Sequence, residues 1–154
     1  MMKASVDLND YFAPRPFPIK KMGSIRCADP AYLEYISGFY GRELGGDIVL
    51  LGFEEVTAYN QDNSFSDFWI IAHSGQGDEY LIHTPTGGVY WWDHDKGEFL
   101  PQDLLNLRID FLAFIQVGAI LGRQEMSDEW LESGYDWSDI AAIAPHLRKI
   151  WPYQ

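Results

Sequence analysis

The chain has 154 residues, of which 47% are apolar and 22% charged, and these values favour one globular domain with a buried core over a disordered chain. The formal net charge is −12, and residues 51–154 carry all of it, with seventeen Asp and Glu against five Lys and Arg. A field of this sign disfavours nucleic acid and anionic membranes and favours a basic partner, although an acidic excess also keeps a protein soluble without any partner.

The cysteine content and the apolar windows limit where the chain can reside. Cys27 has no second cysteine to pair with, so no intrachain disulfide or cysteine-built zinc site can form, and its surroundings indicate a half-buried structural thiol rather than a nucleophile. Residues 1–12 contain Lys3 and two acids but no apolar core, so they do not resemble a signal peptide. The longest apolar window, residues 111–121, is broken by Gln116 and is shorter than the ~20 residues that a membrane span needs. We therefore expect a soluble, cytoplasmic protein.

The start of the chain predicts an extended arm followed by a helix. Three prolines between residues 14 and 18 exclude a helix there, so residues 1–28 are expected to form the arm. Asp29 and Pro30 suit the N-cap and the first position of a helix that ends at Gly41.

A short strand and a polar segment come next. Gly45 and Gly46 predict a turn, and the apolar run 48–53 has the length of a strand. We interpret the polar stretch 54–66 as a helical turn and a loop.

The centre of the chain predicts a three-stranded antiparallel meander. Three short runs rich in aromatic and β-branched residues are separated by glycine-containing turns at 74–78 and 85–88, and they cover residues 68–73, 79–83 and 89–94. Both faces of these strands are apolar. Such strands belong in a sheet that is covered on both faces, or that is covered on one face and binds something on the other.

A second long helix is predicted after the meander. Phe99 is expected to begin a short edge segment, and the apolar spacing from Asp103 onward indicates a helix to Leu121, with Gly122 just past its end. Shorter helices are expected after Ser127 and after residue 136. The sequence thus predicts an α+β fold in which a mainly antiparallel sheet packs against helices 29–41 and 103–121. The predicted core residues are Trp69, Ile71, Tyr80, Ile82, Phe111, Leu112 and Phe114.

Histidines and acids gather at the ends of the meander strands. His94 lies between Asp93 and Asp95, and this set of donors suits a hard or borderline cation, or acid–base chemistry. Asp78 is a further acid at a strand end. The spacing matches no established ligand motif, and side chains at strand ends commonly serve turns or solvent, so both interpretations stay open. We expect no cofactor, because Gly75-x-Gly77 lacks the third glycine and the helix of a dinucleotide site.

The meander also resembles a known family. The motifs that carry this resemblance are Trp69-Ile-Ile-Ala72, the Gly77-Asp78 turn, Tyr80-Leu-Ile82, Gly88-Val89-Tyr90 and His94-Asp95. In this order they resemble the core of the SUKH superfamily, in the branch named for a fungal cell-wall assembly regulator. The resemblance covers residues 29–120. It implies a single SUKH-like domain over residues 1–154, with a core at 29–121 and a helical C-terminal extension at 122–154.

The resemblance also implies a function. Bacterial members of this superfamily mostly act as immunity proteins, which are encoded beside polymorphic or contact-dependent toxins and block them by binding. They are not enzymes and carry no catalytic residues. We therefore predict a non-enzymatic, cytoplasmic immunity protein whose partner is a cognate protein toxin with a basic surface, such as a nuclease, and not nucleic acid or a membrane. Two alternatives stay open: a regulatory scaffold for other proteins, and a metal-dependent hydrolase that uses Asp93, His94 and Asp95. A homodimer also stays open.

The acidic excess selects the candidate residues of a toxin interface. Charged groups would speed the encounter, while a few exposed aromatic side chains would supply the affinity. The candidates are Tyr59, Asp62, Asp67, Trp92, Asp93, Asp95, Glu98, Asp128, Glu129, Trp130 and Glu132.

Overall fold

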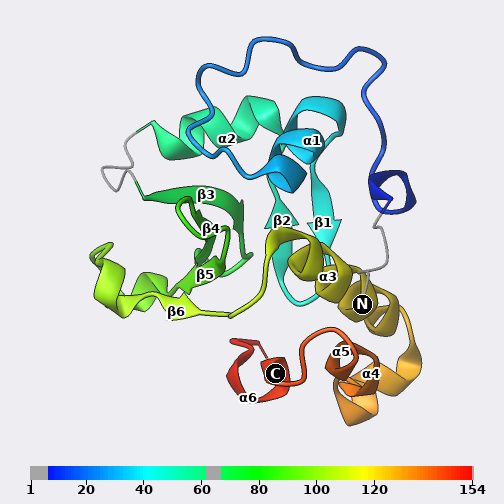
Figure 1. Ribbon diagram of the computed structural model, residues 1–154. Helices are drawn as coiled ribbons and strands as arrows, with labels where there is room; N and C mark the ends of the chain where they lie inside the picture. The colour runs from blue at the N-terminus through cyan, green and yellow to red at the C-terminus, as the bar shows by residue number, and fades with distance from the viewer. Residues whose placement is uncertain (1–6, 62–66, 154) are drawn as a thin grey trace.

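The computed structural model describes residues 7–61 and 67–153. In this part of the chain, one antiparallel sheet has the strand order β1-β2-β3-β4-β5-β6, so each strand pairs with the next along the chain (Figure 1). The strands are β1 (Arg42–Leu44), β2 (Ile48–Leu50), β3 (Phe68–His73), β4 (Glu79–His83), β5 (Val89–Trp92) and β6 (Leu105–Asn106).

Helices flank the sheet, which confirms the predicted α+β class. The α-helices of the described residues are α1 (Pro30–Gly38), α2 (Phe53–Asn60), α3 (Phe111–Glu125), α4 (Asp128–Ser133), α5 (Ser138–Ala141) and α6 (Leu147–Ile150). Three short 3-10 turns are η1 (Leu8–Asp10), η2 (His94–Lys96) and η3 (Pro101–Asp103). Helices α1 and α2 lie at one end of the molecule and α4 to α6 at the other, with α3 between them (Figure 1).

The predicted meander is present, with one shortened strand. β3 and β4 have the predicted bounds, but β5 ends at Trp92 instead of residue 94. The reason is local, because the carboxylate of Asp93 accepts a hydrogen bond from the backbone nitrogen of Asp95 (2.9 Å) and so begins the turn η2. Gly77 and Gly87 adopt φ values of 94° and 77° in the two connecting turns, a conformation that favours glycine.

The alternation of side chains in β3 is broken by a β-bulge. Trp69 pairs with Ile82 and Ala72 pairs with Tyr80, while the register shifts between Ile70 and Ala72. Ala72, rather than Ile71, therefore shares the face of Trp69. One extra residue sits in this strand and breaks the regular alternation of its side chains.

The second long helix begins later and ends later than predicted. Residues 105–106 pair with β5 as the edge strand β6, and Asp110 then caps α3 through a hydrogen bond from the backbone nitrogen of Ala113 (2.9 Å). The predicted start at Asp103 was therefore wrong, as was the edge segment at Phe99, which lies outside the strands. Gly122 lies inside α3 and not after it.

The core joins α1, α3 and the sheet. The ring of Phe111 meets Tyr32 of α1 edge-on, with 5.2 Å between centroids, and Phe114 packs on Tyr80 of β4 at 5.0 Å. Six of the seven predicted core residues are buried. Leu112 is only half-buried, so its assignment to the core was wrong.

The N-terminal arm packs along α1 and α2. Leu8, Phe12 and Cys27 are buried in the core. Both terminal nitrogens of the Arg15 guanidinium bond to the carboxylate of Glu54 on α2, at 2.7 and 2.9 Å. The helix start predicted at Asp29 and Pro30 is confirmed, since Asp29 accepts a hydrogen bond from the backbone nitrogen of Tyr32.

Helices α4 and α5 pack against α3, and Tyr153 near the end of the chain contacts Trp91 of β5. α4 begins after Ser127, as predicted, and α5 begins at Ser138. Among residues 7–61 and 67–153, no helix has both the length and the apolar composition that crossing a bilayer requires.

Candidate functional site

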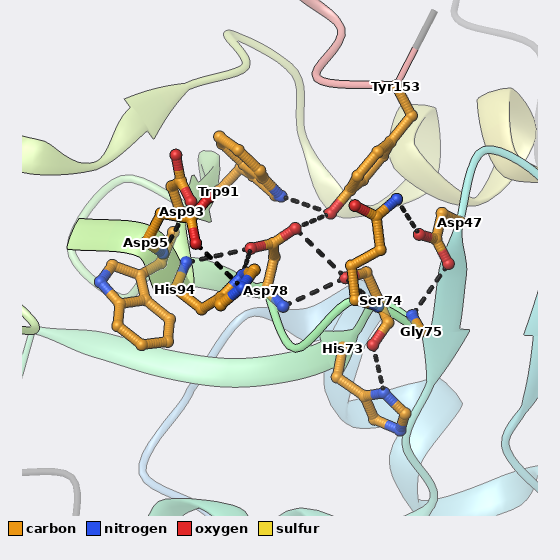
Figure 2. A network of polar contacts seen from close by, with 12 residues as sticks. Asp47, His73, Ser74, Gly75, Asp78, Trp91, Asp93, His94, Asp95 and Tyr153 are labelled. Atoms are coloured by element: carbon orange, nitrogen blue, oxygen red, sulfur yellow. Dashed lines mark hydrogen bonds and ion pairs between the residues drawn. The ribbon is translucent and has the colours of Figure 1, made fainter. Parts of the chain in front are cut away.

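A buried carboxylate, Asp78, is the centre of a polar network at the end of the meander (Figure 2). Its residue is only 3% exposed, in the turn between β3 and β4. One oxygen, Oδ1, accepts the backbone N–H of His94 at 3.0 Å and lies 2.5 Å from Nδ1 of the same histidine. The other oxygen, Oδ2, accepts hydrogen bonds from the hydroxyl groups of Tyr153 and Ser74.

His94 carries this network to the surface. Its Nε2 lies 3.2 Å from a carboxylate oxygen of Asp95, so each ring nitrogen faces an acid. The hydrogen bond to Asp78, with smaller contributions from the neighbouring acids, raises the pKa of His94. Burial, the largest single influence, opposes the charge of Asp78, but hydrogen bonds from Tyr153 and His94 hold the pKa of this carboxyl below its usual value. The pair is therefore a carboxylate–imidazolium bridge below the raised pKa of His94.

The predicted metal ligands are only partly brought together. Ligand atoms of Asp78, Asp93 and His94 lie within 4.8 Å of one another, so Asp78 takes the place that the sequence assigned to Asp95. These groups already serve internal contacts: Asp93 accepts the hydrogen bond that begins η2, and both oxygens of Asp78 accept several. A cation would have to displace these bonds. The arrangement is better suited to joining the sheet to the C-terminal residues than to exposing a reactive group.

The candidate aromatic residues near the meander are engaged in packing. Tyr59 is 40% exposed, and its ring stacks on His73 with 5.6 Å between centroids. Trp92 is half-buried against Phe99, and its indole nitrogen donates to the backbone oxygen of Glu98 (3.1 Å).

The candidate acids near the meander differ in their surroundings. Asp67 is exposed, and its backbone oxygen accepts the N–H of Thr84 at 2.8 Å. Asp95 and Glu98 are also exposed, whereas Asp93 is half-buried. Asp62 lies outside the described residues.

The remaining candidates lie together on α4, beside an acidic hollow. Residues 125–139 contain six acids and no Lys or Arg: Glu125, Asp128, Glu129, Glu132, Asp136 and Asp139. Three of them, Glu129, Asp136 and Asp139, line a hollow of about 360 Å³ together with Trp130, and no Lys or Arg contributes to this lining. We call this the acidic hollow.

A second, more aromatic hollow is also lined by Trp130. Its volume is about 650 Å³, and its lining includes Trp130, Leu131, Tyr135 and Tyr153. We call this the aromatic hollow. Tyr153 thus belongs both to the Asp78 network and to this hollow, and it links the two groups of candidate residues.

No family model, curated protein or solved structure matches this chain. The SUKH resemblance therefore stays a prediction.

Sequence reasoning missed several residues that build these surfaces. Tyr153 and Tyr135 have no motif around them, and their roles come from contacts with distant residues. The hydroxyl of Tyr135 donates to the carboxylate of Glu125 at 2.5 Å. Asp136 and Asp139 had the same signal as the chosen acids, a local excess of negative charge, and could have been included. Cys27 is buried rather than half-buried as predicted, and burial raises the pKa of its thiol.

Proposed function

We propose that this protein is a non-enzymatic binding protein that neutralises a basic cognate protein toxin by covering the toxin's active surface. The observation that carries this proposal is the acidic hollow, in which three carboxylates surround Trp130 without a basic neighbour in the lining. Among the described residues, no Lys, Arg or His forms an ion pair with Asp128, Glu129, Glu132 or Asp139. Their charge is available to a partner.

The charge distribution supports a basic partner. Complementary fields accelerate association, and proteins that hold phosphate groups need basic surfaces, so an acidic protein can compete with a nucleic acid for such a surface. Affinity then depends on a few well-packed aromatic or arginine contacts at the centre of the interface. Trp130 is the candidate aromatic side chain that lines the acidic hollow. Immunity proteins of the superfamily that residues 29–120 resemble act by this kind of binding.

A rescue experiment tests the proposal. A host that is sensitive to the protein encoded beside this chain's gene would express that protein with or without the full chain. We expect growth only when the chain is present, and a stable complex of the two purified proteins. Association should slow as salt is raised, because screening weakens the attraction between exposed charges, while dissociation should change little. Failure of both rescue and complex formation would overturn the proposal. Binding of another cellular protein, with no toxin encoded nearby, would favour a regulatory scaffold.

The proximity of Asp78, Asp93 and His94 supports a second candidate, a metal-dependent hydrolase. Metal analysis of protein purified without added cations separates the two candidates. The binding proposal predicts no stoichiometric zinc or manganese, and it predicts that His94→Gln still rescues growth. A metal that is present in the native protein and lost in His94→Gln would favour the hydrolase instead.

A further inference from the structure

We infer that the surface formed by the acidic hollow and the aromatic hollow, which share Trp130 in their linings, is a docking site for a protein segment that presents an arginine or lysine next to an apolar side chain. This inference depends on the proposed function and gives it a location and a partner chemistry. The acidic hollow would take the basic side chain, and the aromatic hollow would take the apolar one. Trp130 lines both hollows, so a short segment can reach the two at once.

The chemistry of the acidic hollow suits a guanidinium or ammonium group. Carboxylates form charge-assisted hydrogen bonds with such groups, and the face of a tryptophan ring attracts a cation within about 6 Å. The volume of about 360 Å³ falls within the size range of small binding pockets.

A bare metal ion is a poorer fit to the same acids. The described His, Cys, Asp and Glu side chains whose ligand atoms converge closely enough to hold an ion are Asp78, Asp93 and His94. The carboxylates of Glu129, Asp136 and Asp139 do not converge in this way. Spread carboxylates suit an extended, multidentate cation such as guanidinium.

The aromatic hollow supplies the apolar contact. Leu131 is 75% exposed, although it lies beside three aromatic rings that line the same hollow. Two of these rings are held in place: Tyr153 donates to Asp78, and Tyr135 donates to Glu125. Fixed walls lower the entropy that binding costs, and aromatic side chains are typical of the centre of an interface.

The negative field decides which class of macromolecule can dock here. Six acids within residues 125–139 repel the phosphates of nucleic acids and of anionic membranes, whereas a basic protein segment gains from the same field. Charge complementarity therefore selects a basic protein segment.

The test maps peptide binding on the full chain through its six tryptophan indole N–H signals. The protein is labelled with nitrogen-15, and each signal is assigned with a tryptophan-to-phenylalanine variant. The probe is a short peptide of alternating arginine and leucine at low ionic strength, and the control peptide has glutamate in place of arginine. We expect the Trp130 signal to shift in a saturable way with the first peptide only. The signal of Trp69, which is buried and bonded to the Tyr32 hydroxyl, should not move.

Matched variants separate a specific site from general attraction. Glu129→Lys should weaken binding by about tenfold, whereas Glu34→Lys, an equal charge change at an exposed position of α1, should leave it within about twofold. Leu131→Ala should also weaken binding, by about threefold, whereas Met126→Ala, at a residue that is 88% exposed and outside both hollows, should not. If the charge reversal in Glu129→Lys disturbs α4, the comparison of Leu131→Ala with Met126→Ala still tests the site.

The outcomes are distinct. An unmoved Trp130 signal overturns the inference, and so does equal weakening by Glu129→Lys and Glu34→Lys. A shift at Trp92 in place of Trp130 also overturns it but leaves the proposed function standing, with the interface near Asp93 and Asp95. Failure of the growth rescue would instead overturn the proposed function, whatever the peptide binds.

Discussion

The hydroxyl of Tyr153 donates a hydrogen bond to the buried carboxylate of Asp78, 75 positions earlier in the chain (Figure 2). The same hydroxyl accepts the indole N–H of Trp91 at 3.2 Å, and the two rings meet edge-on with 5.9 Å between centroids. These contacts hold the C-terminal residues against β5 and fix one wall of the aromatic hollow.

Removing the Tyr153 hydroxyl should therefore destabilise the fold. Tyr153→Phe leaves the Asp78 carboxylate without one of its donors, and a hydrogen bond to a charged group contributes about 1.5–3 kcal/mol to the free energy of unfolding. Urea unfolding measures this loss. Tyr59→Phe is the matched control, because the Tyr59 ring stacks on His73 at the surface, and it should change the free energy by less than about 0.5 kcal/mol. Equal effects of the two substitutions would contradict the role of the Tyr153 hydroxyl.

The bridge between His94 and Asp78 makes stability depend on pH in two steps. Because the pKa of His94 is raised above 6.5, its contribution is complete below pH 6.5 and is lost as the pH rises through the raised value. Because the pKa of Asp78 is lowered below 3.8, its contribution is complete above pH 3.8 and is lost as the pH falls through the lowered value. The bridge should thus stabilise the fold most between pH 3.8 and 6.5.

Unfolding midpoints of the native chain and of His94→Gln, measured from about pH 5 to about pH 9, test this dependence. We expect the difference between the two proteins to shrink as the pH rises. His83→Gln is the control, since the ring of His83 bonds to the hydroxyl of Thr86 and not to a carboxylate. A constant difference across the range for His94→Gln would show that the imidazolium form is not what stabilises the fold.

Gly45 in the β1–β2 turn lies close to two glycines of α3, Gly118 and Gly122. The backbone nitrogen of Gly45 donates to the oxygen of Gly118 at 2.9 Å, and a Cβ added at Gly45 would lie 2.0 Å from the nitrogen of Gly122. Gly45→Ala should therefore force the turn away from the helix and cost about 3 kcal/mol or more in the free energy of unfolding. Gly23→Ala is the control, because a Cβ there has no atom within 4 Å, and its effect should stay within about 0.5–1 kcal/mol. A native unfolding midpoint in Gly45→Ala would rule out this packing.

Two neighbouring residues of α3 test how the helix meets the core. Phe111 is 1% exposed, whereas Leu112 is half-buried. Phe111→Ala should cost about 3–5 kcal/mol, and Leu112→Ala clearly less, because truncating a fully buried ring leaves a cavity. Thermal or urea unfolding of both variants measures the contrast. Equal losses would mean that α3 is rotated relative to the arrangement described.

Local sequence signals predicted those elements whose cause is local. Asp29 followed by Pro30 predicted the start of α1, because a capping side chain and a preset φ act within one turn of helix. The strands β3 and β4 were predicted from runs of β-branched and aromatic residues between turn formers. Elements that depend on a distant partner were missed, such as β6, whose two residues are a strand only because β5 lies beside them.

The candidate site also contains residues that local sequence signals predicted and contacts that depend on distant partners. The composition of residues 125–139 was enough to select Asp128, Glu129 and Glu132 as acids of a candidate interface, because charge is a property of each residue by itself. Only the tertiary structure placed Trp130 in the linings of two hollows and brought Tyr153 to Asp78. Contacts between residues 75 positions apart leave no periodic pattern in the sequence, because they are decided by how the elements pack once all of them have formed.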